Sequence, residues 1–389
     1  MSGRIGIPLE RSPGERRVAL VPAHVGSLIK SGFEVCIEKG AGESSGYTDA
    51  AYQAAGAQLV PDAATVWKTS DVVLTVRSGA ASSVTIDPKW LKTGQVVIGM
   101  MDPWSPHDSF QAFQKAGVSA FSMELIPRTT RAQAMDVLSS QANLAGYKGV
   151  LLAAELLPKM FPMSMTAAGT IIPAKVFVLG AGVAGLQAIA TARRLGSVVS
   201  AFDVRAAVKE QVQSLGAKFV EFDVGDASGS GGYAKELTPE QQAKQKELMA
   251  AYVTDIDVIV STAAIPGRPS PKLITEAMVK SMPPGSVIVD LASEKGGNCE
   301  LTEPGKTVVK HGVTICGPLN IASTVSFHAS QLYSKNITTF LLNLVNKEKQ
   351  LVIDTKDDIV AATLLTHQGK PGSEKLAGIL GLTSIPGGN

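Results

Sequence analysis

A strand that runs through three spaced glycines into an alanine-rich helix constrains this chain most. The strand covers residues 175–179, and the glycines follow as Gly180, Gly182 and Gly185. The first permits a tight turn, the second lets the backbone approach a pyrophosphate, and the third lets the helix pack close to the strand. Free N–H groups at the start of the helix would face the anion. The pattern predicts a dinucleotide site; a glycine-rich turn in an α/β domain without ligand is the alternative.

A second strand ends in an acid at the spacing that a dinucleotide site requires. Residues 197–202 are mostly apolar, and Asp203 follows them, roughly 20 residues after the glycines. An acid there accepts both hydroxyls of an adenosine ribose, whereas a 2′-phosphate would meet a like charge. The sequence therefore predicts NAD rather than NADP, although Arg205 is a nearby cation that could tolerate phosphate.

Length and strand pattern predict two α/β domains. A chain of 389 residues exceeds the size at which a single core stops growing. Apolar strand signals alternate with helix signals, which indicates mainly parallel sheets with helices on both faces. We expect two doubly wound domains with a ligand cleft between them, the second a Rossmann domain. The expected bounds are 1–140 plus 326–389 for the first domain and 141–325 for the second.

The expected strands follow from short apolar runs. A helical stretch past residue 321 should cross back to the first domain, and two short strands should follow it. The strands are expected at 4–8, 34–38, 71–76, 95–99, 175–179, 197–202, 218–222, 258–261, 286–290, 313–316, 350–354 and 359–365.

Composition excludes several classes of protein. The 36 basic and 34 acidic residues form no long run of one sign, so no nucleic-acid footprint is present. Three widely spaced cysteines without a CxxC indicate neither a disulfide framework nor a zinc site, and no metal is expected. The N-terminus lacks the apolar region of a signal peptide. No uncharged apolar run reaches the ~18 residues of a membrane span, so we expect no direct span.

A glycine-rich segment interrupts the second domain. Residues 223–237 contain four glycines and one aromatic residue, Tyr233. A flexible loop with an aromatic tip suits a lid over a ligand, although an ordinary disordered insertion has the same composition. Thr238 and Gln241 form a capping box that starts the next helix.

Polar residues cluster where the chain enters a long helix between the domains. Arg128, Gln133, Asp136 and Ser139 lie within 12 residues. A glutamine can bond a nicotinamide carboxamide through donor and acceptor, an arginine can bind its oxygen or a phosphate, and an aspartate can hold the arginine or a ribose. By themselves, these residues also fit a helix start with a structural Arg–Asp pair.

The sequence closely resembles the NAD(H)-binding component, domain I, of proton-translocating nicotinamide nucleotide transhydrogenase. The resemblance covers nearly the whole chain. The blocks that carry it are 4–8, 13–20, 131–136, 139–146, 165–169, 182–191, 203–205, 231–236, 283–292 and 296–299.

The resemblance implies a set of site residues. Arg128, Gln133 and Asp136 match the family's loop beside the nicotinamide, with Ser139 next to it, and we expect these four to be catalytic. Tyr233 matches a mobile-loop tyrosine. The residues implied for cofactor binding are Arg128, Thr129, Thr130, Arg131, Gln133, Ser139, Gly180, Ala181, Gly182, Val183, Gly185, Asp203, Val204, Arg205, Gly232, Tyr233, Gln245 and Ala264.

Alanine dehydrogenases share these blocks and provide the main alternative. Amino-acid oxidation needs an acid or base and cations for the carboxylate. Their catalytic histidine would fall at the strand end that here reads Met100-Met101, and their lysine-rich strand end here contains Arg77. None of the five histidines replaces the missing one. We therefore expect Arg17 to be structural, paired with an acid of the first domain, and Glu294 to have no catalytic role.

The departures favour transhydrogenation. Hydride transfer between two nicotinamides releases no substrate proton, so it needs positioning and a dry cleft rather than an acid–base pair. The resemblance implies NAD(H) on this chain, NADP(H) on a partner subunit, and proton translocation in a separate transmembrane subunit. It also implies a homodimer at the cytoplasmic side of the inner membrane. A non-catalytic NADH-sensing module remains a third interpretation, because binding and transfer use the same residues.

Overall fold

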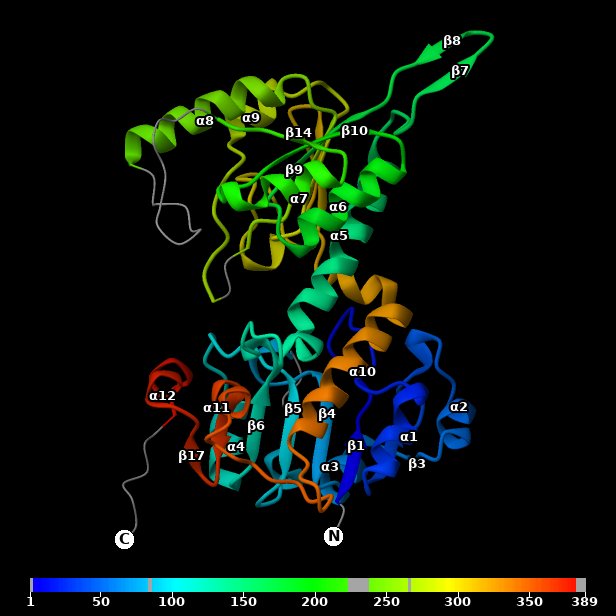
Figure 1. Ribbon diagram of the computed structural model, residues 1–389, viewed down its shortest axis with the longest axis vertical. Helices are drawn as coiled ribbons and strands as arrows, with labels where there is room; N and C mark the ends of the chain where they lie inside the picture. The colour runs from blue at the N-terminus through cyan, green and yellow to red at the C-terminus, as the bar shows by residue number, and fades with distance from the viewer. Residues whose placement is uncertain (1–2, 83–85, 223–237, 265–266, 383–389) are drawn as a thin grey trace. The chain divides into compact units, whose positions relative to one another are not determined.

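The computed structural model describes residues 3–82, 86–222, 238–264 and 267–382. The chain forms two compact units, which are treated separately (Figure 1). Unit 1 comprises Met1–Gln141 and Ser323–Asn389, and unit 2 comprises Ala142–Ala322. Gly232 and Tyr233, the expected tip of a lid, lie outside the described residues.

An eight-stranded sheet organises unit 1, in the order β17-β16-β6-β5-β4-β1-β2-β3. Strands β1 to β6 are parallel, whereas β16 and β17 continue the sheet in antiparallel fashion. The strand order therefore reverses between β1 and β4. The strands are β1 Arg4–Ile7, β2 Glu34–Glu38, β3 Gln58–Val60, β4 Val72–Arg77, β5 Val96–Met100, β6 Ser119–Ser122, β16 Leu364–His367 and β17 Lys370–Pro371.

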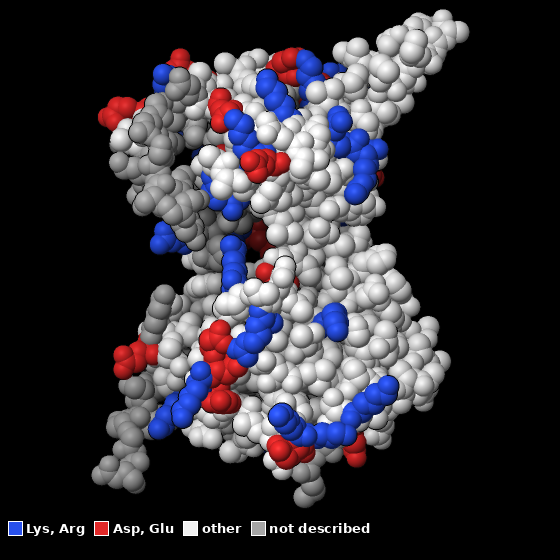
Figure 2. Space-filling view, in the orientation of Figure 1, with Lys and Arg blue, Asp and Glu red and all other residues white. Residues whose placement is uncertain are grey.

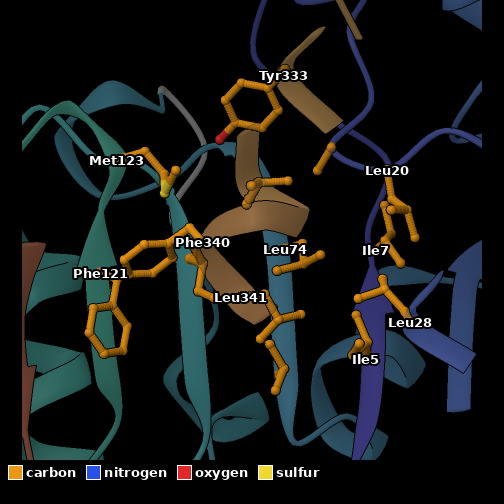
Figure 3. Close-up of a cluster of buried hydrophobic side chains, with 14 of the residues drawn as sticks. Ile5, Ile7, Leu20, Leu28, Leu74, Phe121, Met123, Tyr333, Phe340 and Leu341 are labelled. Atoms are coloured by element: carbon orange, nitrogen blue, oxygen red, sulfur yellow. The ribbon is translucent and has the colours of Figure 1, made fainter. Parts of the chain in front are cut away.

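Helix α10, Ser326–Asn343, completes the core of unit 1 although it comes late in the chain. Its Tyr333, Phe340 and Leu341 are fully buried against side chains from the strands, as Figure 3 shows. The Phe340 ring meets that of Phe121 at 5.4 Å between centroids. The other helices of this unit are α1 Pro22–Lys30, α2 Asp49–Ala54, α3 Ala63–Thr69, α4 Asp108–Ala116, α11 Asp358–Thr363 and α12 Glu374–Leu380.

Unit 2 is a second doubly wound sheet, in the order β11-β10-β9-β12-β13-β15-β14. All its neighbouring strands are parallel except β14 and β15. Alternate residues of β9 join two different apolar clusters, so both faces of the sheet are covered. The elements are β9 Lys175–Leu179, β10 Val198–Phe202, β11 Lys218–Phe219, β12 Val258–Ser261, β13 Val287–Asp290, β14 Thr307–Lys310, β15 Val313–Cys316, α6 Val183–Arg194, α7 Lys209–Ser214, α8 Pro239–Val253 and α9 Glu276–Ser281.

A two-stranded hairpin of unit 2 projects away from its sheet (Figure 1). Strands β7 Ser164–Thr166 and β8 Gly169–Ile171 pair only with each other. Large apolar side chains on and beside them are exposed: Met163 at 60%, Met165 at 76% and Ile172 at 77%. A lone hairpin is marginally stable in water, so these side chains lack the burial that usually supports one.

Shorter elements complete the chain. Helix α5, Val137–Leu156, begins in unit 1 and ends in unit 2. Single 3₁₀ turns occur at Glu43–Ser45, Gly79–Ala81, Pro88–Trp90, Met123–Leu125, Gln133–Met135, Ala206–Val208, Ser293–Lys295 and Ile321–Val325.

The expected α/β class with mainly parallel sheets is confirmed, but two expected strands near the C-terminus are wrong. Residues 359–363 belong to helix α11, because the Asp357 carboxylate accepts hydrogen bonds from the N–H groups of Ile359 and Val360 and caps the helix. At 350–354, Leu351 makes only an isolated bridge with Val345. The chain turns into sheet only at β16.

The surface in Figure 2 carries interspersed positive and negative side chains. Across the described ranges, no helix has both the length and the apolar character needed to cross a bilayer. Within the same ranges, no three His, Cys, Asp or Glu side chains gather as metal ligands would.

Candidate nucleotide-binding site

The turn from β9 into α6 has the geometry that its glycines predict. Gly180 has φ +93°, and its N–H donates to the Phe202 carbonyl at 2.9 Å. A Cβ on Gly185 would lie 1.8 Å from the Gly180 carbonyl oxygen, so only glycine fits there. A Cβ on Gly182 would meet nothing within 4 Å. The first and third glycines are therefore needed by the fold, while the second faces open space.

Helix α6 starts without a side-chain cap. Gly182 is its N-cap, and no acidic residue lies in its first turn. The first N–H groups of a helix lack intrahelical acceptors and carry the positive end of its dipole. Together with the open side of Gly182, this helix start can hold a phosphate group against the backbone.

Asp203 is tied to the glycine turn. One carboxylate oxygen accepts the Ala181 N–H at 2.7 Å and Arg205 Nη2 at 2.9 Å, and the other accepts the N–H and Nε of Arg205 at 2.8 and 2.9 Å. Burial alone would raise the pKa of the carboxyl, but the bonds from Arg205 and Ala181 outweigh it and hold the pKa below its usual value. The acid is thus ionised beside the turn.

Arg205 occupies both oxygens of the acid that the ribose would use. Its side chain is 40% exposed, whereas that of Asp203 is 6% exposed. A guanidinium at the surface can leave a carboxylate with modest loss, because such pairs contribute little in water. Hydroxyl groups of a ribose could therefore replace it.

The end of β12 closes the other side of the turn. Thr262 donates its hydroxyl to the Gly180 carbonyl at 3.0 Å. Asn298, fully buried, accepts the Ala263 N–H at 3.1 Å and donates to the Ala263 and Pro271 carbonyls at 2.8 and 2.9 Å. These bonds fix the backbone just before Ala264, which is exposed. The roles of Thr262 and Asn298 were not anticipated; the only signal was the block 296–299.

The remaining predicted residues of unit 2 are distributed around this turn in sequence. Val183 opens α6, and Val204 is 57% exposed beside Asp203. Gln245 lies half-buried on α8, whose start carries the expected capping box of Thr238 and Gln241.

In unit 1, the predicted polar loop leads through the 3₁₀ turn Gln133–Met135 into α5. Asp136 accepts the N–H of Ser139 at 2.9 Å and its hydroxyl at 2.6 Å, so these two residues cap the helix. Arg128 and Gln133 are exposed. The loop therefore combines a fixed helix start with two polar side chains available to a ligand.

Two contacts anchor this loop within unit 1. Arg131 forms ion pairs with Asp357 and Asp358 at the start of α11. Asn336 of α10 donates to the Ala134 carbonyl at 2.9 Å and accepts the Ser140 hydroxyl at 2.7 Å. Asn336 was not anticipated, although an asparagine within an apolar helix is a signal for such a contact. Thr129 and Thr130 are exposed in the same loop.

The positions that amino-acid oxidation would use are occupied differently. Glu15 accepts Nε and Nη2 of Arg17 at 2.7 and 2.6 Å, and both side chains are buried, which confirms the expected structural pair. Met101 is fully buried at the end of β5. Glu294 accepts the Asn320 N–H at 2.5 Å.

Comparison with family profiles gives two adjacent matches. Residues 6–145 match the alanine dehydrogenase/PNT N-terminal domain, and residues 149–373 match the alanine dehydrogenase/PNT C-terminal domain.

Named relatives fall into two groups. The first portion of the NAD(P) transhydrogenase subunit alpha of Rhodospirillum rubrum, which is a polypeptide of its own, is 49% identical over 371 residues, covering 94% of this chain and 97% of the relative. The alanine dehydrogenase of Mycolicibacterium smegmatis is 28% identical, covering 96% of this chain and 95% of the relative. The transhydrogenase structure from Sinorhizobium meliloti superposes with a TM-score of 0.85 at 48% identity, covering 95% of this chain and 99% of the other.

Proposed function

Since the chain belongs to the alanine dehydrogenase/PNT family, and within it to the NAD(P) transhydrogenase alpha subunits, we propose that it is the NAD(H)-binding subunit of a proton-translocating transhydrogenase. It would bind NADH and position it for direct hydride transfer to NADP⁺ on a partner subunit. The observation that carries the proposal is the glycine turn of unit 2, with its open side at Gly182 and an ionised acid at Asp203.

The adenosine and pyrophosphate end of NADH would be held in unit 2. The α6 start and Gly182 suit the pyrophosphate, and Asp203 suits the ribose after Arg205 turns away. Replacing Asp203 with Asn should reduce the preference for NADH over NADPH, and equal affinities in the unaltered chain would reject this role. The other residues proposed for nucleotide contact in this unit are Gly180, Ala181, Val183, Gly185, Val204, Gly232, Tyr233, Gln245 and Ala264.

The nicotinamide end would be positioned by the loop before α5. We assign its carboxamide to Gln133 and Arg128, with Asp136 and Ser139 supporting the loop as the helix cap and Arg131 anchoring it. Thr129 and Thr130 complete the proposed contacts. Exposure of Arg128 and Gln133 on an anchored loop supports this role, because a positioning residue must be available yet held in place.

The proposed reaction moves a hydride, two electrons with a proton, from C4 of NADH to C4 of NADP⁺. The products are NAD⁺ and NADPH, and no substrate proton is released. The chain therefore needs no general acid or base at this step, only placement and exclusion of water. The buried Arg17–Glu15 pair supports this assignment, since an arginine already paired with an acid is a poor receptor for an amino-acid carboxylate.

Assembly with other subunits belongs to the proposal. The name of the Rhodospirillum rubrum relative describes a divided subunit alpha, so we expect other polypeptides to carry NADP(H) and the proton path. The chain would then sit peripherally at the cytoplasmic side of the inner membrane.

We further propose that the chain forms a homodimer through the β7–β8 hairpin. Met165 and Ile172 expose most of their apolar surface, and a second copy would bury it. Replacing both with aspartate should shift the sedimentation coefficient from dimer to monomer. A monomeric unaltered chain at micromolar concentration would reject the dimer.

Hydride transfer can be tested directly. The chain is mixed with the NADP(H)-binding subunit of a transhydrogenase, and NADPH formation from NADH and NADP⁺ is followed. We expect acceleration that requires both proteins, and no NAD⁺-dependent oxidation of L-alanine by this chain alone. Binding of NADH without acceleration would favour the sensing module, and alanine oxidation would favour the dehydrogenase.

A further inference from the structure

Unit 1 contains a cavity of about 300 Å³ that the proposed nucleotide site does not use. Its walls come from the residues after β1, the end of β4, the start of α3 and the segment around Trp90, and every lining residue belongs to unit 1. The cavity thus opens at the carboxyl ends of β1 and β4, between which the strand order reverses. Ligands of open α/β sheets bind at such a reversal.

The walls are mainly apolar and aromatic. Trp67 of α3 is 3% exposed, and Trp90 and Ile86 are half-buried. Two indole rings with aliphatic neighbours provide flat apolar surface of the kind that binds an aromatic ring. The volume is at the small end of the range for ligand pockets, roughly 300–1,000 Å³. A compact, flat molecule fits these walls better than a nucleotide does.

The charged groups in the lining favour an anion. Arg11 and Arg77 both contribute to the walls, and their acidic partners, Glu38 and Glu15, are not lining residues. Asp62 also lines the cavity, but its carboxylate accepts the Thr65 N–H at 2.7 Å as the cap of α3. Two guanidinium groups therefore face one carboxylate that is already engaged.

Glu10 adds a carboxyl that is neutral near physiological pH. Its oxygens accept the N–H groups of Val76 and Arg77 at 2.5 and 3.3 Å. Burial and the nearby Glu15 raise the pKa of Glu10 to about 8. A protonated Glu10 does not repel an anion in the cavity.

We propose that this cavity binds a small monocarboxylate with a flat apolar body. The ring would lie against Trp67 and Trp90, and the carboxylate would point toward Arg77 and Arg11. Guanidinium groups bind carboxylates through strong charge-assisted hydrogen bonds. The segment between β1 and α1 contains one glycine, Gly14, among 14 residues, so it lacks the glycine turn that a dinucleotide would need.

Isothermal titration of the full chain with benzoate tests the proposal. We expect saturable binding at pH 7, with size-matched benzylamine binding about tenfold more weakly because its ammonium group meets the two guanidinium groups. Saturating NADH should leave the benzoate affinity unchanged. Absence of saturable binding up to millimolar benzoate, equal binding of benzylamine, or displacement by NADH would each overturn the proposal.

Two variants locate the site. Ala64→Phe places a ring at the cavity wall and should abolish benzoate binding, whereas the matched control Ala361→Phe, at an exposed position of α11 in the same unit, should not change it. Trp90→Ala removes one aromatic wall and should weaken benzoate about tenfold. Far-UV circular dichroism and thermal midpoints identify any variant that fails to fold. A folded Ala64→Phe or Trp90→Ala protein that binds benzoate like the wild type would reject this location.

Discussion

The second and third glycines of the turn should respond to the same substitution in opposite ways. At Gly185, a methyl group would lie 1.8 Å from the Gly180 carbonyl oxygen, and the turn and α6 must separate by about 1.2 Å to reach even 3.0 Å. Overpacking of this kind costs ~1–3 kcal/mol, against which the helix preference of alanine returns at most ~1 kcal/mol. We expect Gly185→Ala to lower the free energy of unfolding by about 1–2 kcal/mol.

Gly182→Ala should leave the fold unchanged but impair binding. Its φ is −77°, which any residue adopts, and nothing lies within 4 Å of the added Cβ. The free energy of unfolding should change by less than ~0.5 kcal/mol. If the pyrophosphate approaches this position, the methyl group takes its place, and NADH affinity should fall by about tenfold or more, ~1.4 kcal/mol.

Urea unfolding followed by circular dichroism measures stability without nucleotide, and fluorescence titration measures NADH affinity. Each variant serves as the control for the other, because both add one methyl group within one turn. Wild-type NADH affinity in Gly182→Ala would show that the open side does not receive the pyrophosphate. Wild-type stability in Gly185→Ala would show that the packing there is looser than the 1.8 Å approach implies.

Three further predictions concern other regions of the chain. Glu10→Gln should remove a pH dependence of stability: with a folded pKa of about 8 against an unfolded value near 4.5, the wild type should lose stability as pH rises from about 5 to 8. Urea midpoints across that range would be flat for the variant, and parallel curves would contradict the assignment. Gln133→Asn keeps the amide but shortens its reach, so hydride transfer with the partner subunit should fall more than NADH affinity; proportional losses would reject positioning. Gly146→Ala places a Cβ 2.0 Å from the Ala184 carbonyl oxygen and should lower the thermal midpoint of unit 2, and an unchanged midpoint would refute that contact.

Local patterns predicted the strands of both sheets well where they were buried. The runs ending at Ile7 and Leu179 are continuous apolar segments, and such segments are typical of parallel strands covered on both faces. Asp203 was also predictable, because its spacing from the glycines is imposed by one strand–helix–strand unit. These features depend on residues near one another in sequence.

Features that depend on distant residues were not predictable. Asn298 and Asn336 fix the backbone at Ala263 and Ala134, and neither sequence position shows which carbonyl its amide will meet. The mistaken strand at 359–365 contains β-branched and apolar residues, but Asp357 caps a helix there. A single capping side chain outweighed the local preference for sheet.

The division of unit 1 between the two ends of the chain determines when its interior can be completed during synthesis. Residues 1–141 leave the ribosome long before α10, so Ile5 and Leu74 must wait for Tyr333 and Leu341 to cover them. Unit 2, continuous from 142 to 322, has all its residues available earlier. The nucleotide turn can therefore fold first, while the opening strands remain exposed to chaperones and to premature association until the ribosome has translated the segment beyond residue 341.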